Sequence, residues 1–137
     1  AEEFKRIFLI FGKYCVDLFD FGETEFARER FRKNDLFIAI SLSGESPEAI
    51  RVLRCVQGAE IRTLSLTRWA NNTLAAMCQE NLYVGTKTVY QGASQSYEMV
   101  AAFYILLDIL SVRYLEYRAQ NEEDTADAGG RASEQSL

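Results

Sequence analysis

DLFIAISLSGESPEAIRVLRCVQGAEIRTLSLT, residues 35–67, contains a strand, a serine-rich loop, a helix and a second strand in succession. The apolar run at 36–41 is typical of a strand buried on both faces of a parallel sheet. Pro47 suits the first position of a helix that Gly58 ends, and residues 61–67 predict the next strand. Two strands joined by a helix favour a parallel pair with the helix as the crossover connection.

The residues before this unit predict a helix, a strand and a second helix. Residues 4–11 carry apolar side chains at the i, i+3, i+4, i+7 spacing of a helix face, and Gly12 is typical of a helix C-terminus. The run IFLIF within them could instead be a buried strand, but we favour the helix. YCVDLFD at 14–20 predicts a short strand, and residues 23–32 predict a surface helix.

The residues after the unit continue the alternation of helix and strand. We predict a helix at 71–79, a short strand at 81–86 and a long helix at about 94–119 with a wide apolar stripe. This order indicates an α/β fold, a parallel sheet with helices on both faces, in a single domain at 1–119. Residues 120–137 are acidic and poor in large apolar side chains, so we expect a disordered tail.

The charge of the chain is concentrated in this tail. The formal net charge of the 137 residues is −5, and residues 119–137 hold five acidic side chains against one arginine, a net charge of −4. The rest of the chain is therefore close to neutral, and without a basic patch we do not expect it to grip nucleic acid by itself. The sequence has no apolar run of membrane-spanning length and no signal-peptide pattern, so we expect a soluble cytoplasmic protein without a membrane partner.

Histidine is absent from the sequence. This absence removes the commonest general base, the commonest metal ligand and every Ser-His or Cys-His nucleophile pair, so it weighs against most hydrolases. Cys15, Cys55 and Cys78 are widely spaced among apolar neighbours and are predicted to be buried free thiols, with a disulfide or a zinc site as the alternative. We therefore expect neither a metal nor a cofactor.

The loop at 41–46 is the main candidate for chemistry, because open α/β sheets bind ligands at the carboxyl ends of their strands. Ser46 suits the N-cap of the following helix, and Gly44 allows close approach of the backbone. Together with Ser41 and Ser43, Ser46 offers neutral donors to a phosphate at the positive end of that helix. On spacing alone, helix capping without any ligand explains the same residues equally well.

The strand, loop and helix resemble the central signature of sugar isomerase (SIS) domains, in which an apolar strand is followed by Ser-x-Ser-Gly-x-Thr or Ser, a helix, Gly-Ala and a second strand ending in Thr. RWANNTLAAMCQENLYVGT, residues 68–86, is similar to the next SIS segment, and the last helix resembles that of RpiR-type transcriptional regulators. In those regulators an SIS domain senses a sugar phosphate and an N-terminal helix-turn-helix domain binds DNA. The resemblance implies ligand contacts from three serine hydroxyls, two loop amides and one threonine: Ser41, Ser43 and Ser46, Gly44 and Glu45, and Thr67.

The start of the chain departs from the SIS pattern. SIS domains begin with a strand and a Gly-x-Gly-x-Ser type loop, whereas residues 1–13 match the helix after that loop. We therefore expect the first strand, its loop and the DNA-binding domain to lie upstream of Ala1. In the flavodoxin-like order 2-1-3-4-5 the first strand is interior, so we expect a gap beside the strand at 36–41 or a strand borrowed from elsewhere. If IFLIF is the first strand instead, the usual helix before 14–20 is lost.

Three kinds of function fit these residues. A sensor domain binds a sugar phosphate without turnover, and a site of hydroxyls and amides supports that reading. A sugar-phosphate isomerase or lyase needs a base, and Glu45, Glu48 and Glu98 are the carboxylates near the predicted pocket. A domain that serves only oligomerisation is the third possibility. We favour the sensor and assign no catalytic residue.

The aromatic residues leave two readings open. Trp69 follows a strand end and could stack on a sugar or pack against protein. Phe4, Phe8 and Phe11 could form a dimer face with the last helix or pack within one subunit. Because SIS domains commonly pair, and because the last helix has more apolar positions than one sheet face needs, we expect a homodimer.

Overall fold

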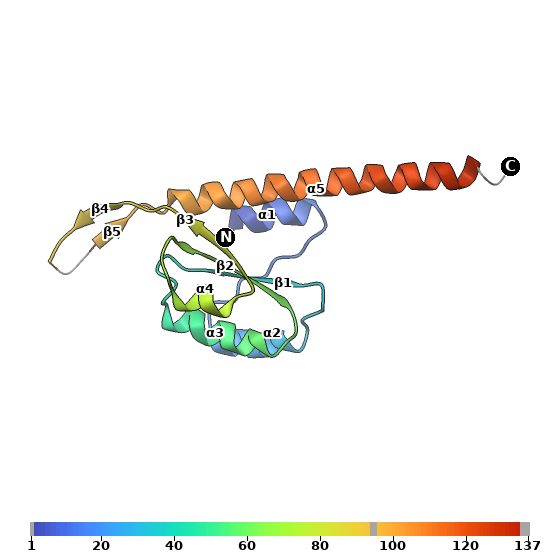
Figure 1. Ribbon diagram of the computed structural model, residues 1–137. Coiled ribbons are helices and arrows are strands. Elements are labelled where there is room, and N and C mark those ends of the chain that lie inside the picture. The colour runs from blue at the N-terminus through green and yellow to red at the C-terminus, as the bar shows by residue number, and fades with distance from the viewer. Residues whose placement is uncertain (1, 94–95, 135–137) are drawn as a thin grey trace. The chain divides into compact units, whose positions relative to one another are not determined.

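The computed structural model describes residues 2–93 and 96–134, with helices and strands in the order that Figure 1 labels. The chain divides into two compact units. The sheet unit is residues 16–104, and the helical unit combines residues 1–15 with residues 105–137. The two ends of the chain thus belong to one unit, and the middle of the chain forms the other.

The sheet unit contains a three-stranded parallel sheet in the order β1-β2-β3. The strands are β1 Leu36–Ile40, β2 Arg62–Arg68 and β3 Glu80–Val84. In the centre of the β1-β2 pair, Ile38 lies opposite Leu64. These strands are the three predicted at 36–41, 61–67 and 81–86, and the α/β class with a parallel sheet flanked by helices is confirmed.

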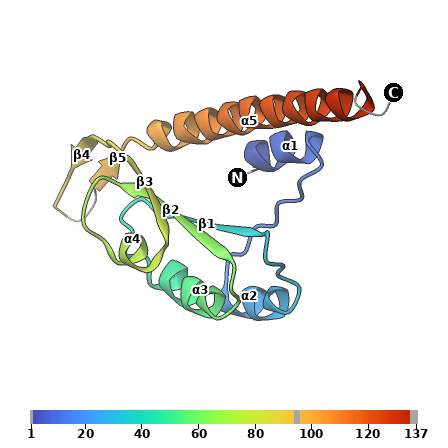
Figure 2. The same ribbon diagram turned by 45° about the vertical axis from the view of Figure 1, so that its right-hand side comes forward.

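Three helices of this unit lie together on one face of the sheet (Figures 1 and 2). They are α2 Phe21–Arg28, α3 Pro47–Gln57 and α4 Thr73–Met77. Helix α3 connects β1 to β2 and begins at Pro47 with Ser46 as its N-cap, as its sequence predicts. Helix α4 connects β2 to β3, so both loops that precede these helices lie at the carboxyl end of a strand.

The core of the sheet unit joins these helices to the strands. Leu53 of α3 and Leu74 of α4 are fully buried and pack in one apolar cluster with Ala39 of β1 and Cys78. Burying a leucine side chain contributes about 1.5–3 kcal/mol relative to leaving it exposed. The cluster holds α3 and α4 against the sheet, and it thereby fixes the loops before them.

Local caps shift two helices from their predicted bounds. Helix α2 begins at Phe21 rather than residue 23, because the Asp20 side chain accepts a hydrogen bond from Glu23 N at 2.8 Å and caps the helix. It ends at Arg28, before the predicted end at residue 32. Helix α4 is shorter than the predicted 71–79, because Asn72 is its N-cap and Cys78, with an extended backbone, is its C-cap.

The strand predicted at 14–20 is wrong. The residues between α1 and α2 form no strand, and Tyr14, Val16 and Phe19 are 89%, 76% and 74% exposed. A strand needs a hydrogen-bonded neighbour, and apolar composition alone does not supply one. Among the described strands β1 pairs only with β2, so its other edge is open, in agreement with the gap expected beside that strand.

A two-stranded antiparallel ribbon was not predicted. It consists of β4 Thr88–Gln91 and β5 Ser96–Glu98, where the sequence analysis placed a loop and the beginning of the last helix. Residues 88–90 are Thr, Val and Tyr, all strong strand formers, and Met99 N donates to Lys87 O at 3.0 Å to close the ribbon. The last helix, α5, therefore begins at Ala101.

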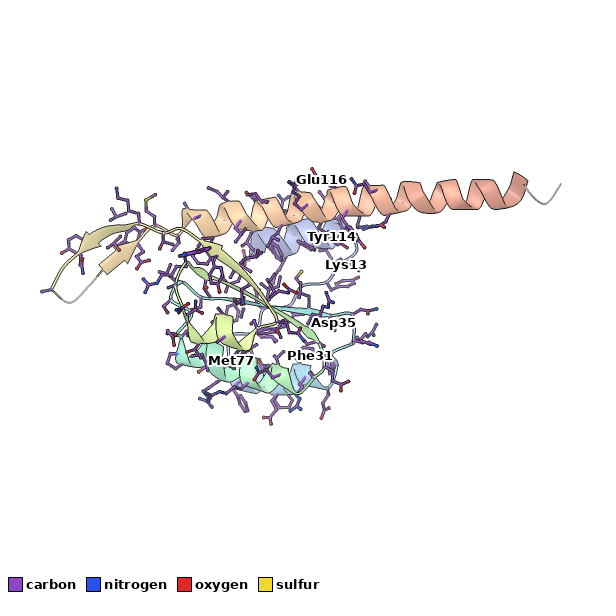
Figure 3. All side chains as sticks on the ribbon, viewed as in Figure 1. Lys13, Phe31, Asp35, Met77, Tyr114 and Glu116 are labelled. Carbon is purple, nitrogen blue, oxygen red and sulfur yellow. The ribbon has the colours of Figure 1, made fainter. Side chains whose placement is uncertain are left out.

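The helical unit pairs α1, Glu2–Ile10, with α5. The Phe8 ring stacks on Tyr114, labelled in Figure 3, at 5.1 Å between centroids. Helix α1 ends at Gly12 in the left-handed region (φ 72°), where Lys13 N donates to Phe8 O at 2.9 Å in a Schellman arrangement. The helix expected at 4–11 is confirmed, and at least Phe8 packs within one chain.

Helix α5 runs from Ala101 to Glu134, past the expected end of the domain at 119. The helix thus enters the segment expected to be a disordered tail, and residues 135–137 lie outside the described part. The division into a domain at 1–119 and a tail at 120–137 stays a prediction. Within the described residues, no helix combines the length and the apolarity needed to cross a membrane.

None of the three cysteines forms a disulfide within the described part of the chain. Cys55 and Cys78 are buried as predicted, and desolvation by burial raises the pKa of the Cys78 thiol. Cys15 is only half-buried, which corrects its prediction, because it lies in the segment that forms no core strand. Among the described residues, no group of three or more histidine, cysteine or carboxylate side chains is arranged to hold a metal ion.

Candidate ligand-binding site

The serine loop, residues 41–46, leaves the carboxyl end of β1 and leads into α3. Two backbone hydrogen bonds join it to β2. Ser41 N donates to Leu66 O at 3.1 Å, and Arg68 N donates to Leu42 O at 3.1 Å. The serine loop and the end of β2 therefore lie side by side, as expected for the carboxyl ends of neighbouring parallel strands.

Each serine of the loop accepts a hydrogen bond from a nearby backbone amide. Gly44 N donates to Ser41 Oγ at 3.2 Å, Glu45 N to Ser43 Oγ at 3.1 Å, and Ala49 N to Ser46 Oγ at 3.4 Å. All three serines are half-buried. The amides of Gly44 and Glu45, expected to point at a ligand, thus already have acceptors within the loop.

The donor side of the same hydroxyls is unused. Among the described residues, no hydrogen bond has the hydroxyl of Ser41, Ser43 or Ser46 as its donor. An oxygen that accepts an N–H still carries its own O–H, so each serine can donate to an oxygen outside the chain. Three such donors beside the positive end of α3 are suited to phosphate or sugar oxygens.

Gly44 has a structural role that the sequence analysis did not foresee. It is buried in the left-handed region (φ 70°), and a Cβ there would overlap the side chain of Asn72. Its carbonyl accepts a hydrogen bond from Leu74 N at 3.0 Å. Because Gly44 has no side chain, the N-terminus of α4 can approach the loop closely. The sequence analysis expected this space to serve a ligand.

Glu45 ties the serine loop to the same helix. Its carboxylate accepts from Thr73 N and from Thr73 Oγ1, both at 2.7 Å. These hydrogen bonds favour the charged form and lower the pKa of the Glu45 carboxyl. The carboxylate thus caps the N-terminus of α4, and the Glu45 amide, which was predicted to contact a ligand, donates to Ser43 Oγ.

Thr67 lies at the end of β2 but its hydroxyl is already engaged. The residue is fully buried, and Oγ1 accepts from Asn72 Nδ2 at 2.9 Å and donates to Arg68 O at 3.3 Å. The structure places Thr67 next to the loop, yet these bonds give its hydroxyl a structural partner. A ligand contact from Thr67 stays a prediction.

Sequence reasoning missed the role of Asn72. Its position in the run NNT, directly before a helix, is a local signal by which it could have been recognised as an N-cap.

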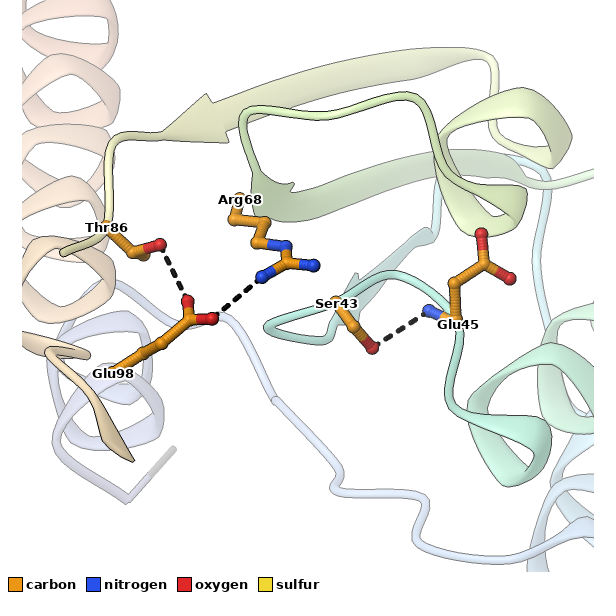
Figure 4. A network of polar contacts seen from close by, with 5 residues as sticks. All are labelled: Ser43, Glu45, Arg68, Thr86 and Glu98. Atoms are coloured by element: carbon orange, nitrogen blue, oxygen red, sulfur yellow. Dashed lines mark hydrogen bonds and ion pairs between the residues drawn. The ribbon is translucent and has the colours of Figure 1, made fainter. Parts of the chain in front are cut away.

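Sequence reasoning missed an ion pair that lies at the end of β2, beside the serine loop (Figure 4). Arg68 Nη1 lies 2.7 Å from Glu98 Oε1, and Thr86 Oγ1 donates to the other carboxylate oxygen at 2.8 Å. The Glu98 side chain is 13% exposed and that of Arg68 41%. Glu98 was considered as a group near the ligand, but its partner 30 residues earlier left no local signal.

The remaining candidates have other surroundings. Glu48 Oε1 accepts from Phe21 N at 3.2 Å, so this carboxylate links the first turns of α2 and α3. Trp69 is 79% exposed, and its ring meets Tyr83 edge-on at 5.2 Å between centroids. An open hollow of about 430 Å³, lined in part by Arg62, lies at the amino ends of the strands and is separate from the serine loop.

The fold and these residues define an SIS domain. A family model described as "SIS domain" matches residues 1–113, so the chain belongs to the SIS domain family. The expected resemblance is thereby confirmed.

The chain is also similar to individual known proteins. The chain is 33% identical over 124 residues to "HTH-type transcriptional regulator GlvR" of Bacillus subtilis (strain 168), covering 90% of this chain and 49% of that protein. The structure of "The Vibrio vulnificus NanR protein complexed with ManNAc-6P" superimposes with a TM-score of 0.70 at 22% identity, over 93% of this chain and 49% of the other. A further solved structure, "Crystal structure of an hypothetical protein", has a TM-score of 0.63 at 16% identity, over 87% and 64%. The chain therefore spans about half the length of GlvR and NanR.

Proposed function

We propose that this domain binds a phosphorylated sugar at the serine loop and serves as the effector-sensing part of a bacterial transcriptional regulator. The observation that carries the proposal is the set of three serine hydroxyls, each held by a backbone amide and each with an unused O–H donor. The three serines belong to the loop that leads into the N-terminus of α3, which favours an anion.

The comparisons support the ligand class and the biological role. NanR was solved in a complex with ManNAc-6P, a sugar phosphate, and GlvR is a helix-turn-helix regulator. In this proposal, DNA is bound through a helix-turn-helix domain that precedes the SIS domain, because the described part of the chain offers no basic patch. The regulator acts as a homodimer in the cytoplasm.

Binding without turnover fits the surroundings of the three carboxylates considered as bases. Glu45 caps α4, Glu48 contacts the first residue of α2, and Glu98 accepts a hydrogen bond from Thr86 Oγ1. A general base must be within hydrogen-bond reach of the proton it removes, and these carboxylates already have partners. Their engagement favours the sensor over an isomerase or lyase.

Titration calorimetry of the chain with glucose 6-phosphate, fructose 6-phosphate and ManNAc-6P tests the proposal. We expect at least one of these to bind, with the unphosphorylated sugars binding far more weakly. Replacing Ser43 by Ala removes one neutral donor and should weaken binding about threefold to tenfold, since one such hydrogen bond contributes about 0.5–1.5 kcal/mol. Glu25→Gln, which removes an exposed carboxylate from α2, is the control and should bind as the wild type does.

Two results would contradict the proposal. One is the absence of binding by every sugar phosphate of the panel, accompanied by an unchanged melting temperature. The other is rapid interconversion of the aldose and ketose phosphates during incubation with the protein, which would make the domain an enzyme rather than a sensor.

A further inference from the structure

The end of β2 places a cation beside the serine loop. Arg68 is the last residue of β2, and its backbone N–H donates to Leu42 O of the loop. Successive side chains of a strand point to opposite faces. Thr67 points toward Asn72, so Arg68 points to the other side of the strand, where Figure 4 shows its guanidinium beside Glu98.

The ion pair uses only part of the guanidinium. Among the described residues, the contact between Nη1 and Glu98 Oε1 is the one polar contact of the Arg68 side chain. A guanidinium carries five N–H donors and binds phosphate through two of them at once. Arg68 therefore keeps donors for a second anion while it is paired with Glu98.

The pair is also able to exchange partners. With 41% of the Arg68 side chain exposed, water reaches the guanidinium and screens its attraction to Glu98, whose own side chain is 13% exposed. A phosphate group carries more charge than one carboxylate and offers three acceptor oxygens. Glu98 keeps its hydrogen bond from Thr86 Oγ1 when Arg68 leaves, so the carboxylate is not left without a donor.

We infer that Arg68 is a further anion-binding residue of this site. An anionic ligand bound at the serine loop displaces Glu98 from the Arg68 guanidinium. The inference rests on the proposed function and names the residue that distinguishes phosphorylated from neutral sugars.

The exchange has a structural consequence for the ribbon. Glu98 ends β5, shortly before α5 begins at Ala101, and its carboxylate joins the ribbon to β2 through Arg68. A two-stranded ribbon is marginally stable by itself. Loss of the ion pair to a ligand therefore loosens β4 and β5 and the entry to α5, and ligand binding is communicated to those elements.

Opposite substitutions of the two partners test the exchange. We expect Arg68→Gln to weaken binding of ManNAc-6P and glucose 6-phosphate at least tenfold, because a charge-assisted hydrogen bond is lost. We expect Glu98→Gln to bind both probes several times more tightly than the wild type, because the competing carboxylate is removed. Inorganic phosphate is titrated in parallel to show that the effect follows the anionic group.

Fluorescence of Trp69 gives a second readout, because this residue is the single tryptophan of the chain and follows Arg68 directly. Its emission should change when the wild type binds, and free Glu98→Gln should already resemble the bound form. Arg113→Gln and Glu116→Gln break an exposed ion pair on α5 and serve as controls that leave binding unchanged. Melting curves show whether each variant is folded.

The outcomes separate the two proposals. If the wild type binds a sugar phosphate and Arg68→Gln binds it equally well, only the role of Arg68 is overturned. If both variants weaken binding alike, the pair is a fixed structural contact and the exchange is wrong. If the wild type binds none of the probes, the proposed function and this inference fail together.

Discussion

At the scale of single residues, the serine loop combines neutral donors with one nearby cation. The hydroxyls of Ser41, Ser43 and Ser46 are held by backbone amides, and the Arg68 guanidinium lies at the adjacent strand end. Neutral donors act at contact distance, whereas a cation also attracts anions from farther away. Neutral hydroxyl donors together with one cation are suited to a ligand that carries both sugar hydroxyls and a phosphate.

Gly44 gives a sharp test at this scale. Gly44→Ala should destabilise the fold by about 1–3 kcal/mol through the left-handed backbone alone, and overlap with Asn72 adds to the loss. Urea unfolding measures the change. Gly85→Ala is the matched control, since its added Cβ meets no atom within 4 Å and its φ is not in the left-handed region. Equal stability of the two variants would show that the loop does not depend on Gly44.

The positions of the loop serines could be predicted from sequence, but their partners could not. Pro47 after Ser46 is a local signal for a helix N-terminus, and the structure bears it out. The contacts of Gly44 with Asn72, and of Arg68 with Glu98, join residues far apart in the chain. Such pairings depend on which strands become neighbours, and a single sequence carries no local pattern for them.

At the scale of elements, the N-terminus of α4 is coupled to the serine loop through Glu45. Since its folded-state pKa lies below the ordinary value of 4.5, the carboxylate stabilises the fold above that pH. This contribution is lost as the pH falls through the folded pKa. We therefore expect the difference in urea midpoint between wild type and Glu45→Gln to shrink as the pH is lowered from 7 to 3.

The control for this titration is Glu25→Gln, which removes an exposed carboxylate from α2 and leaves Thr73 capped. A difference between wild type and Glu45→Gln that stays constant over the whole pH range would rule out the charged cap. Thr73→Ala, which keeps the carboxylate but removes one of its donors, should reduce the stability at pH 7.

Elements with their own start and stop signals were predictable, and elements that need a partner were not. Helix α3 was found from Ser46, Pro47 and Gly58, and α1 from its apolar spacing and Gly12. The segment at 14–20 has the composition of a strand, but it pairs with none of the described strands. The ribbon was missed because its two short strands are stable only as a pair, and the sequence of one strand does not indicate its partner.

At the scale of the whole molecule, an exposed apolar stripe on α5 supports a homodimer. Ile105, Ile109 and Val112 follow the i, i+4, i+7 spacing of one helix face and are 59%, 51% and 54% exposed. We expect light scattering after gel filtration to give twice the mass of one chain, and Ile109→Asp to give a monomer. Val89→Asp on the ribbon is the control and should remain dimeric. A monomeric wild type at high concentration would contradict the proposal.

The open edge of β1 has a consequence for handling the protein. Its outer backbone N–H and C=O groups have no strand beside them among the described residues, and Leu36 and Ile40 at its ends are 53% and 46% exposed. An unprotected strand edge of this kind is a template on which another chain can add by β-augmentation. We therefore expect concentrated samples of residues 1–137 alone to associate edge to edge, and lysine in place of Leu36 to reduce this association.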